Sequence, residues 1–411
     1  MALLLVLYLA ACVDRMIFAV LAPAIQPALG LTNAQLGFVQ GPAYALPYAA
    51  ALPFAGWLGD RWRAHRVLAG SILVWSAGLL LCASASGLAT VVAGRALCGV
   101  GQAAVMPVAL GAIWRTVSPN RAGRSIALFT ATGTLGRSAA FGLGGLLLAW
   151  FAQRGVGGAW SAVLVVLVGI NALLLAALLA TGTGTGTLAG AEPTPGPAAS
   201  RSVGRQSLWS VVRDAPARVA ATVAAALGPV VVVQAVTAWV ASTLTQTHHL
   251  PVARAGGLIA LAGLAAPLGH VTGGWIVDRA AGPRTVGLAQ AALATTCVPA
   301  TMAIAFAESI DLAVGGVAVL MLVAGAGAVA GLERVQRLVP ASIRGRANGV
   351  FLLLAAAIGS GGGPWAVGLL AGRGAVGTAL VYVVAVTATI AAVGAFVIAF
   401  TADPDDPGTV A

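Results

Sequence analysis

Four ionisable side chains lie inside long apolar stretches of the sequence. Asp14 and Arg15 are adjacent, and Arg95 and Arg137 lie in separate stretches further along the chain. Charged side chains within a membrane are costly and usually functional, so these four are the first candidates for a site. Arginine binds carboxylate and phosphate through a planar fork of N–H groups. One carboxylate among three guanidiniums leaves a surplus of positive charge, which predicts an anionic cargo.

Asp14 is the candidate for proton coupling. Burial favours the neutral form of a carboxyl group, whereas a neighbouring arginine favours the ionised form. A cargo anion that competes for that arginine would therefore link proton binding to transport. An alternative is a buried Asp14–Arg95 pair that ties two helices together.

The composition identifies the elements that position these residues. The chain has 411 residues, of which 59 % are hydrophobic and 8 % are charged, against roughly 25 % charged in soluble proteins. This composition excludes a soluble enzyme, a nucleic-acid-binding protein and a disordered chain. A spanning helix needs about 20 apolar residues, so the hydrophobic content predicts about twelve spans. Their expected ranges are 2–25, 33–58, 67–87, 89–114, 122–152, 158–181, 216–247, 254–278, 285–307, 312–333, 346–371 and 375–401.

The arginines predict the orientation of these spans. All basic residues apart from the histidines are arginines, and the formal net charge is +11. Cytoplasmic loops of membrane proteins carry the excess of basic residues. The even-numbered loops hold sixteen arginines and the odd-numbered loops three, Arg154, Arg254 and Arg373. We therefore expect the even-numbered loops and both termini to be cytoplasmic, in the inner membrane of a bacterium.

The predicted depths place the charged residues in one region. At 1.5 Å per residue, Asp14 lies ~18 Å from the inner end of the first span and Arg137 ~22 Å from the inner end of the fifth. Arg95 lies ~9 Å below the outer surface in the fourth span. All three are expected around the outer half of the first six helices, although Arg137 could instead lie nearer the edge.

The sequence repeats itself across its two halves. Gly56–Arg61 at the end of the second span is similar to Gly274–Arg279 at the end of the eighth, 218 residues later. Two six-helix halves that both start inside form a parallel repeat, an architecture of transporters whose site lies at the midplane. The predicted organisation is all-α and polytopic, with a first half at 1–182, a low-complexity cytoplasmic linker at 183–215, a second half at 216–402 and a cytoplasmic tail at 403–411. Within the linker, 207–213 is either a short interfacial helix or an unstructured tether.

The second half offers neutral polar side chains instead of charges. Gln234 and Trp239 in the seventh span, with Gln102 in the fourth, complete the predicted substrate-binding set. A charged half that faces an apolar half suits an amphiphilic cargo, although an apolar wall is also ordinary helix packing. The glycine run 359–363 before Pro364 is either a hinge or a site of close packing.

Several motifs resemble the major facilitator superfamily over essentially the whole chain. Gly56-x-x-x-Asp60-Arg61 resembles the family's loop motif after the second span, although Arg63 and His65 depart from it. Arg95-x-x-x-Gly99-x-Gly101-x-Ala103 resembles the family's second motif. The resemblance implies a secondary transporter of two six-helix halves that works by alternating access.

Within that superfamily the sequence looks most like the spinster branch. The residues that carry this likeness are Val13-Asp14-Arg15, Gln35-Leu36-Gly37, Trp75-Ser76 and Gly99-Val-Gly101-Gln102-Ala103. The resemblance implies a lysophospholipid or sphingolipid cargo and proton coupling. Gln102 replaces the branch's usual glutamate, which leaves passive exchange open. A drug or organic-anion carrier of the same superfamily is the alternative cargo class, since organic-anion symporters also carry Asp-Arg in the first span.

The resemblance also implies a gate at the ends of the second and eighth spans. Gly56, Asp60 and Arg61 would latch the halves in one state, and Asp278 and Arg279 form the second copy. The alternative for both copies is a topological anchor.

Other kinds of function find little support in the sequence. The pair His248-His249 has no nearby carboxylate or cysteine, and the four cysteines lie in apolar stretches. We therefore expect no metal site, no cofactor, no enzymatic activity and no nucleic-acid partner. The expected partners are a small amphiphilic or anionic substrate, protons and membrane lipids, with the protein a monomer. A receptor or scaffold that does not transport is the remaining alternative.

Overall fold

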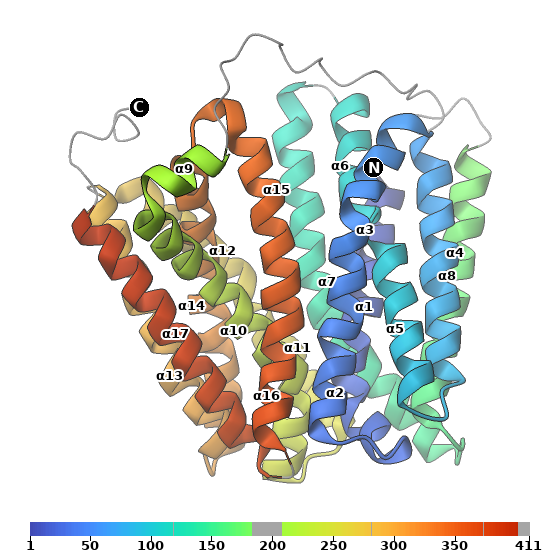
Figure 1. The fold of residues 1–411 in the computed structure, drawn as a ribbon. Coiled ribbons are helices and arrows are strands. Elements are labelled where there is room, and N and C mark those ends of the chain that lie inside the picture. The colour runs from blue at the N-terminus through green and yellow to red at the C-terminus, as the bar shows by residue number, and fades with distance from the viewer. Residues whose placement is uncertain (118, 183–207, 281, 373, 402–411) are drawn as a thin grey trace. The chain divides into compact units, whose positions relative to one another are not determined.

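The computed structural model describes residues 1–117, 119–182, 208–280, 282–372 and 374–401. Within them every regular element is a helix, so the predicted all-α fold is confirmed (Figure 1). Eleven of these helices are long and apolar enough to cross a membrane. The predicted tail and most of the predicted linker lie outside the described residues.

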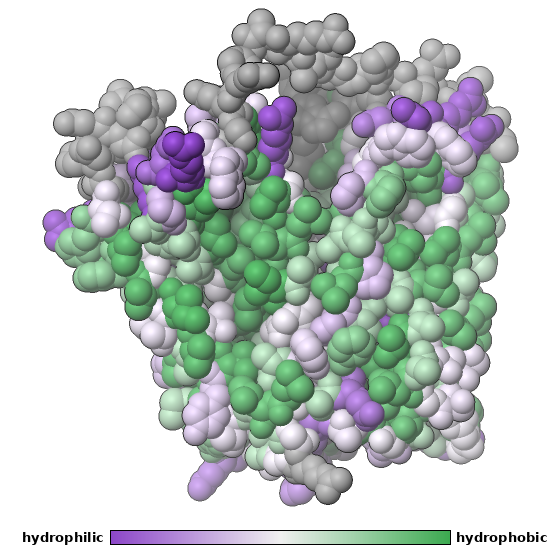
Figure 2. All heavy atoms as spheres, viewed as in Figure 1, coloured by the Kyte–Doolittle hydropathy of each residue, from purple (hydrophilic) through white to green (hydrophobic). Residues whose placement is uncertain are grey.

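The surface of the helices is suited to lipid. Figure 2 shows hydrophobic residues along the middle of the helices and hydrophilic residues gathered near their ends. Large side chains such as Phe54, Leu173 and Val271 are each more than 70 % exposed. In water such a surface would be unfavourable, whereas in hydrocarbon it costs nothing.

The chain divides into two compact units. Unit 1 comprises Met1–Ser200 and Leu250–Ala260, and unit 2 comprises Arg201–His249 and Leu261–Ala411. The helices of unit 1 are α1 (Ala2–Ala28), α2 (Asn33–Gln40), α3 (Pro42–Arg61), α4 (Ala64–Ala83), α5 (Leu88–Gln102), α6 (Val105–Thr116), α7 (Pro119–Gln153), α8 (Ala159–Gly182) and most of α11 (Val252–Gly263).

The predicted second span consists of two helices. α2 begins at a capping box in which Thr32 and Gln35 bond to each other's backbone N–H groups. It ends at Gly41, and α3 starts with Pro42, which lacks an N–H group and cannot continue the α2 hydrogen bonds. The interruption leaves carbonyl groups near the end of α2 available to side chains.

Unit 2 holds the remaining helices. They are α9 (Leu208–Asp214), α10 (Pro216–His248), the end of α11 (Val252–Gly263), α12 (Ala265–Arg279), α13 (Pro283–Phe306), α14 (Ile310–Arg337), η1 (Ala341–Ile343), α15 (Arg344–Leu354), η2 (Ala355–Gly362), α16 (Gly363–Ala371) and α17 (Val376–Thr401). Of the two alternatives for 207–213, a short helix or an unstructured tether, the structure has the helix, α9. Its Leu208 and Val211 pack against Val339 and Ile343.

The two units share a packing pattern, which agrees with the sequence repeat. In unit 1, α5 packs on both α3 and α4, and α4 packs on α8. In unit 2, α14 packs on both α12 and α13, and α13 packs on α17. These are the same relations between the second, third, fourth and sixth spans of each repeat.

The glycine run near Pro364 forms a π-helix, η2, which opens the regular hydrogen-bonding pattern of its span. A Cβ placed on Gly359 would lie 2.7 Å from Val230, and one on Gly363 would lie 3.0 Å from the carbonyl oxygen of Val231. These glycines therefore provide close packing against α10, the second of the two roles predicted for them.

Candidate functional site

Asp14 lies in the middle of α1 and is 2 % exposed. Its Oδ2 accepts hydrogen bonds from Nε1 of Trp75 on α4, at 3.1 Å, and from Nδ2 of Asn171 on α8, at 2.6 Å. Both donors are buried and neutral. Three helices thus meet at one carboxyl oxygen, and the donors compensate the cost of removing it from water.

Arg15 faces a different set of partners. Its Nε donates to the hydroxyl of Tyr44 on α3 at 2.8 Å, and its guanidinium lies over the rings of Tyr44 and Tyr48. The Tyr44 hydroxyl in turn donates to Oε1 of Gln102 on α5 at 2.8 Å. A chain of hydrogen bonds therefore links the first, second and fourth spans, and aromatic faces stabilise the cation.

Arg95 on α5 is 2 % exposed. Its Nε donates to the carbonyl oxygen of Val39 at 3.1 Å, one of the groups left available by the end of α2. Its guanidinium lies over the rings of Phe18 and Tyr44, 4.5 and 4.7 Å from their centroids. The interruption of the second span is therefore part of how this arginine is held.

The buried Asp14–Arg95 pair considered as an alternative is absent, since Asp14 bonds to Trp75 and Asn171 and Arg95 to a backbone carbonyl. Each of the two side chains forms its hydrogen bonds with neutral groups and not with the other side chain. The surplus of positive charge is therefore larger than the sequence predicted. Within the described residues, no carboxylate forms an ion pair with the arginines at Tyr44.

Two buried donors at this site lack a hydrogen-bond partner among the described residues. They are Nη1 of Arg95 and Nε2 of Gln102. A buried donor left unpaired costs about 1–3 kcal/mol. Both lie on α5, seven residues apart, and the shared neighbour Tyr44 contacts both side chains. The pair is suited to a ligand that presents oxygen acceptors.

Arg137 belongs to the same region. It is half-buried on α7, and a Cβ placed on the preceding Gly136 would lie 2.7 Å from Cβ of Cys12 on α1. The charge of Arg137 interacts with that of Arg15 and with the side chain of Cys12. The structure thus places Arg137 close to Arg15, which shares the Tyr44 ring with Arg95. The common depth predicted for Asp14, Arg95 and Arg137 stays a prediction.

The unit 2 candidates contact the glycine-rich segment. Nε2 of Gln234 donates to Oγ of Ser360 at 2.7 Å, and Nε1 of Trp239 donates to the carbonyl oxygen of Pro364 at 2.8 Å. Trp239 is completely buried. Its substrate contact stays a prediction, while its hydrogen bond satisfies a backbone group beside the π-helix.

The two copies of the loop motif have the same local geometry. Arg61 lies over the ring of Trp57 at 4.4 Å, and Arg279 lies over the ring of Trp275 at 4.8 Å. Asp60 and Asp278 precede these arginines at the exposed ends of α3 and α12. Gly56 lies one turn earlier, with open space beside it. The gating role of these residues stays a prediction.

Asn171, Tyr44 and Tyr48 are site residues that the sequence analysis missed. Asn171 is a single amide within a long apolar span, a signal of the same kind that singled out Asp14. The sequence does not single out the tyrosines, because aromatic residues are common in apolar helices. Their contacts with Arg15 and Gln102 become visible only in the folded structure.

The sequence profile of the Major Facilitator Superfamily matches residues 4–364. The chain therefore belongs to this superfamily, which confirms the family predicted from the sequence and agrees with a membrane transporter rather than an enzyme.

Curated relatives match only part of the chain. A multidrug resistance protein B homolog of Mycobacterium tuberculosis is 33 % identical over 135 residues, which cover 33 % of this chain and 24 % of the relative. A probable sulfoacetate transporter of Cupriavidus necator is 34 % identical over 114 residues, or 27 % of this chain and 26 % of the relative. The matched segments thus span about a quarter of each relative's length.

Solved structures match nearly the whole chain. A bacterial homolog of the human lysosomal transporter Spinster, in an inward-facing and unoccupied conformation, has a TM-score of 0.79 at 20 % identity, covering 97 % of this chain and 96 % of its own. The nucleoside transporter NupG has a TM-score of 0.71 at 15 % identity, covering 98 % of this chain and 99 % of its own. The chain thus shares its fold both with a bacterial Spinster homolog, the branch that the sequence resembles, and with a nucleoside transporter.

Proposed function

We propose that this protein is a secondary transporter that moves an anionic amphiphile across the bacterial inner membrane by alternating access. The observation that carries the proposal is the pair of arginines over the Tyr44 ring, Arg15 and Arg95, beside the unpaired donors of Arg95 and Gln102. Arg137 adds a third positive charge close to Arg15. Unpaired positive charge is costly inside a membrane protein, and a bound anion would offset that cost. A lysophospholipid or sphingolipid phosphate supplies the acceptors, and its acyl chain is compatible with the apolar helices.

Asp14 is the proposed proton carrier. It is buried and its hydrogen bonds come from neutral donors, so its ionised form depends on the two hydrogen bonds from Trp75 and Asn171. A change of conformation that breaks either bond would favour protonation. Direct competition between Asp14 and a cargo anion for one arginine has no support from this geometry, because Asp14 accepts its hydrogen bonds from Trp75 and Asn171. Gln102 cannot release a proton, so Asp14 is the single acid of the proposed site.

A carrier of small organic anions or drugs is the second candidate. The arginine group fits any carboxylate or sulfonate, and the relatives named above include a multidrug resistance protein homolog and a probable sulfoacetate transporter. The cargo's apolar part separates this candidate from the first, because a small organic anion needs no apolar surface.

Uptake into proteoliposomes tests the proposal. Radiolabelled lysophosphatidate, lysophosphatidylcholine and a small sulfonate are compared, with and without a pH gradient. We expect lysophosphatidate uptake that the gradient stimulates and that Arg95→Ala abolishes, while Arg154→Ala, at an exposed arginine of unit 1, transports normally. Preferred uptake of the sulfonate would favour the second candidate. Binding without uptake, insensitive to loss of Asp14 and Arg95, would favour a receptor or scaffold.

The orientation is tested separately. The arginine distribution places the linker 183–215 in the cytoplasm together with both termini. A cysteine introduced into this linker should react only with reagents that enter the cytoplasm. Labelling by an impermeant reagent from the periplasm would reverse the proposed topology.

A further inference from the structure

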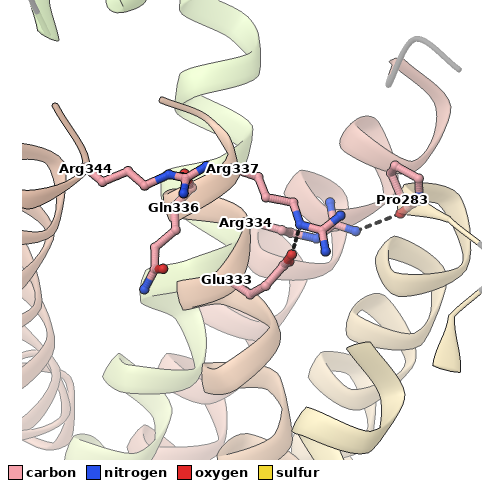
Figure 3. A network of polar contacts seen from close by, with 6 residues as sticks. All are labelled: Pro283, Glu333, Arg334, Gln336, Arg337 and Arg344. Atoms are coloured by element: carbon pink, nitrogen blue, oxygen red, sulfur yellow. Dashed lines mark hydrogen bonds and ion pairs between the residues drawn. The ribbon is translucent and has the colours of Figure 1, made fainter. Parts of the chain in front are cut away.

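A second buried arginine lies in unit 2, outside the proposed cargo site. Arg334 is near the end of α14 and is 7 % exposed. Its Nη2 donates to the carbonyl oxygen of Pro283, the first residue of α13, at 2.9 Å (Figure 3). Gly287 makes room for the guanidinium, since a Cβ there would lie 3.0 Å from Nη2. The guanidinium is therefore held against the first turn of α13.

The remaining donors of Arg334 are not used. Nε and Nη1 are buried and have no hydrogen-bond partner among the described residues. The neighbouring acid, Glu333, forms an ion pair with Arg337 instead, and Figure 3 shows Glu333 and Arg334 directed to different partners. A buried guanidinium with two unpaired nitrogen donors, and no hydrogen bond to a carboxylate among the described residues, is an incomplete site. Leaving such donors unpaired is costly.

The surroundings favour an anion. Arg337 is close enough on α14 for its charge to act on Arg334, and Nε of Arg344 at the start of α15 donates to the carbonyl oxygen of Gln336 on α14 (Figure 3). Arg284 extends from the first turn of α13 over the ring of Phe400. No side chain caps the start of α13, whose N–H groups attract negative charge. Only Glu333 opposes this charge in the group shown.

We propose that Arg334, with the first turn of α13 and the arginines around it, binds a phosphate group at this end of unit 2. Phosphate matches the planar fork of arginine and accepts several hydrogen bonds at once. The site lies where spanning helices end, the depth at which basic pockets between helices bind anionic lipid headgroups. The phosphate of an anionic phospholipid and free phosphate share this chemistry.

Thermal unfolding of the purified full chain tests the site. The protein is titrated with phosphatidylglycerol, phosphatidylcholine or inorganic phosphate at matched ionic strength. We expect phosphatidylglycerol to raise the unfolding midpoint in a saturable way and phosphatidylcholine to have little effect. A shift with inorganic phosphate alone would support the site and identify free phosphate as its occupant.

Arg334→Gln is the variant to compare. It removes a buried charge and keeps an amide that can donate to Pro283, so the fold is expected to persist. It should weaken the apparent affinity for phosphatidylglycerol roughly ten- to hundred-fold, the loss expected for a charge-assisted contact. Arg154→Gln, an exposed arginine of unit 1 that donates to its own helix, should respond as the unmodified protein does.

A measurement on the unmodified protein completes the test. Phosphatidylglycerol should slow hydrogen exchange of the amides at 284–287 relative to phosphatidylcholine. Equal shifts with both lipids and no effect of inorganic phosphate would overturn the proposal. So would an unchanged response in Arg334→Gln, or unchanged exchange at 284–287 under saturating amounts of whichever ligand, phosphatidylglycerol or inorganic phosphate, raises the unfolding midpoint.

Discussion

The first helix of each repeat shows how the two units differ. α1 packs mainly on α7 and makes few contacts with α8, and it sends Asp14 and Arg15 to polar partners on α3, α4 and α8. Its counterpart α10 packs extensively on both α14 and α17. The first helix of unit 1 thus makes charged side-chain contacts with its neighbours. The first helix of unit 2 packs closely on α14 and α17, and its polar side chains Gln234 and Trp239 are neutral.

Small residues explain the close contact of α10. A Cβ placed on Gly331 of α14 would lie 2.6 Å from Cα of Ala226, and one on Gly394 of α17 would lie 2.6 Å from the carbonyl oxygen of Ala221. Helices in membranes associate through such small residues because lipid gives no hydrophobic driving force. In unit 1, large side chains such as Trp75 and Phe18 surround the polar groups instead.

The comparison indicates a division of labour within one fold. Unit 1 concentrates charge and unpaired donors at considerable cost, which supports a role in cargo and proton binding. Unit 2 uses its corresponding helices for packing, and its buried arginine lies at the end of a helix rather than in the middle.

The largest expected effect is the loss of cargo binding on removal of Arg95. Arg95→Ala should lower affinity for an anionic cargo by about 3 kcal/mol, roughly a hundred-fold or more. Arg95→Lys should recover little, because a point charge does not reproduce the planar fork. Equilibrium binding with a labelled lysolipid measures both variants, and Arg154→Ala serves as the control. Equal binding of neutral and anionic lysolipids by the unmodified protein would refute the charge argument.

The second prediction concerns Asp14. Asp14→Asn should preserve binding and remove the pH dependence of uptake, because an amide releases no proton. Asn171→Ala should shift the pH dependence to higher pH, since removing a donor disfavours the ionised carboxylate. Uptake measured across a pH series distinguishes the two variants. Robust uptake driven by a pH gradient in Asp14→Asn would show that the coupling site lies elsewhere.

The third prediction concerns packing in unit 2. Gly331→Ala should destabilise the protein by about 1–3 kcal/mol, because the new Cβ would collide with the backbone of α10. Gly315→Ala, on the same helix with open space around it, should be neutral or stabilising by up to about 1 kcal/mol. Thermal unfolding in detergent compares the two. Similar effects of both changes would mean that the close contact of α10 contributes little.

The smallest effect is expected at the repeated loop motif. Asp60→Asn should shift the population toward the inward-facing state by removing one charge of the proposed latch. Trp57→Ala should act in the same direction more weakly, since a cation–π contact at an exposed site contributes about 0.5–1 kcal/mol. Distance distributions between spin labels at the cytoplasmic ends of the two halves measure the shift. An unchanged distribution in Asp60→Asn would make this aspartate an anchor.

The sequence by itself determined the all-α membrane fold, the family and the group of charged candidates. Apolar runs long enough to span a bilayer can satisfy their backbone only as helices, and charge within them is rare enough to stand out. Because each helical residue adds about 1.5 Å, counting residues along the spans also predicted similar depths for Asp14, Arg95 and Arg137.

Only the tertiary structure decided which groups contact each other. Residue counting gives the depth of a residue along a helix but not the direction of its side chain. The sequence therefore left an Asp14–Arg95 pair possible, whereas the partners of Asp14 are Trp75 and Asn171. The interruption at Gly41-Pro42, the carbonyl of Val39 that holds Arg95, and the unpaired guanidinium of Arg334 all depend on neighbouring helices. Contacts between residues far apart in the chain arise from packing, which local sequence does not encode.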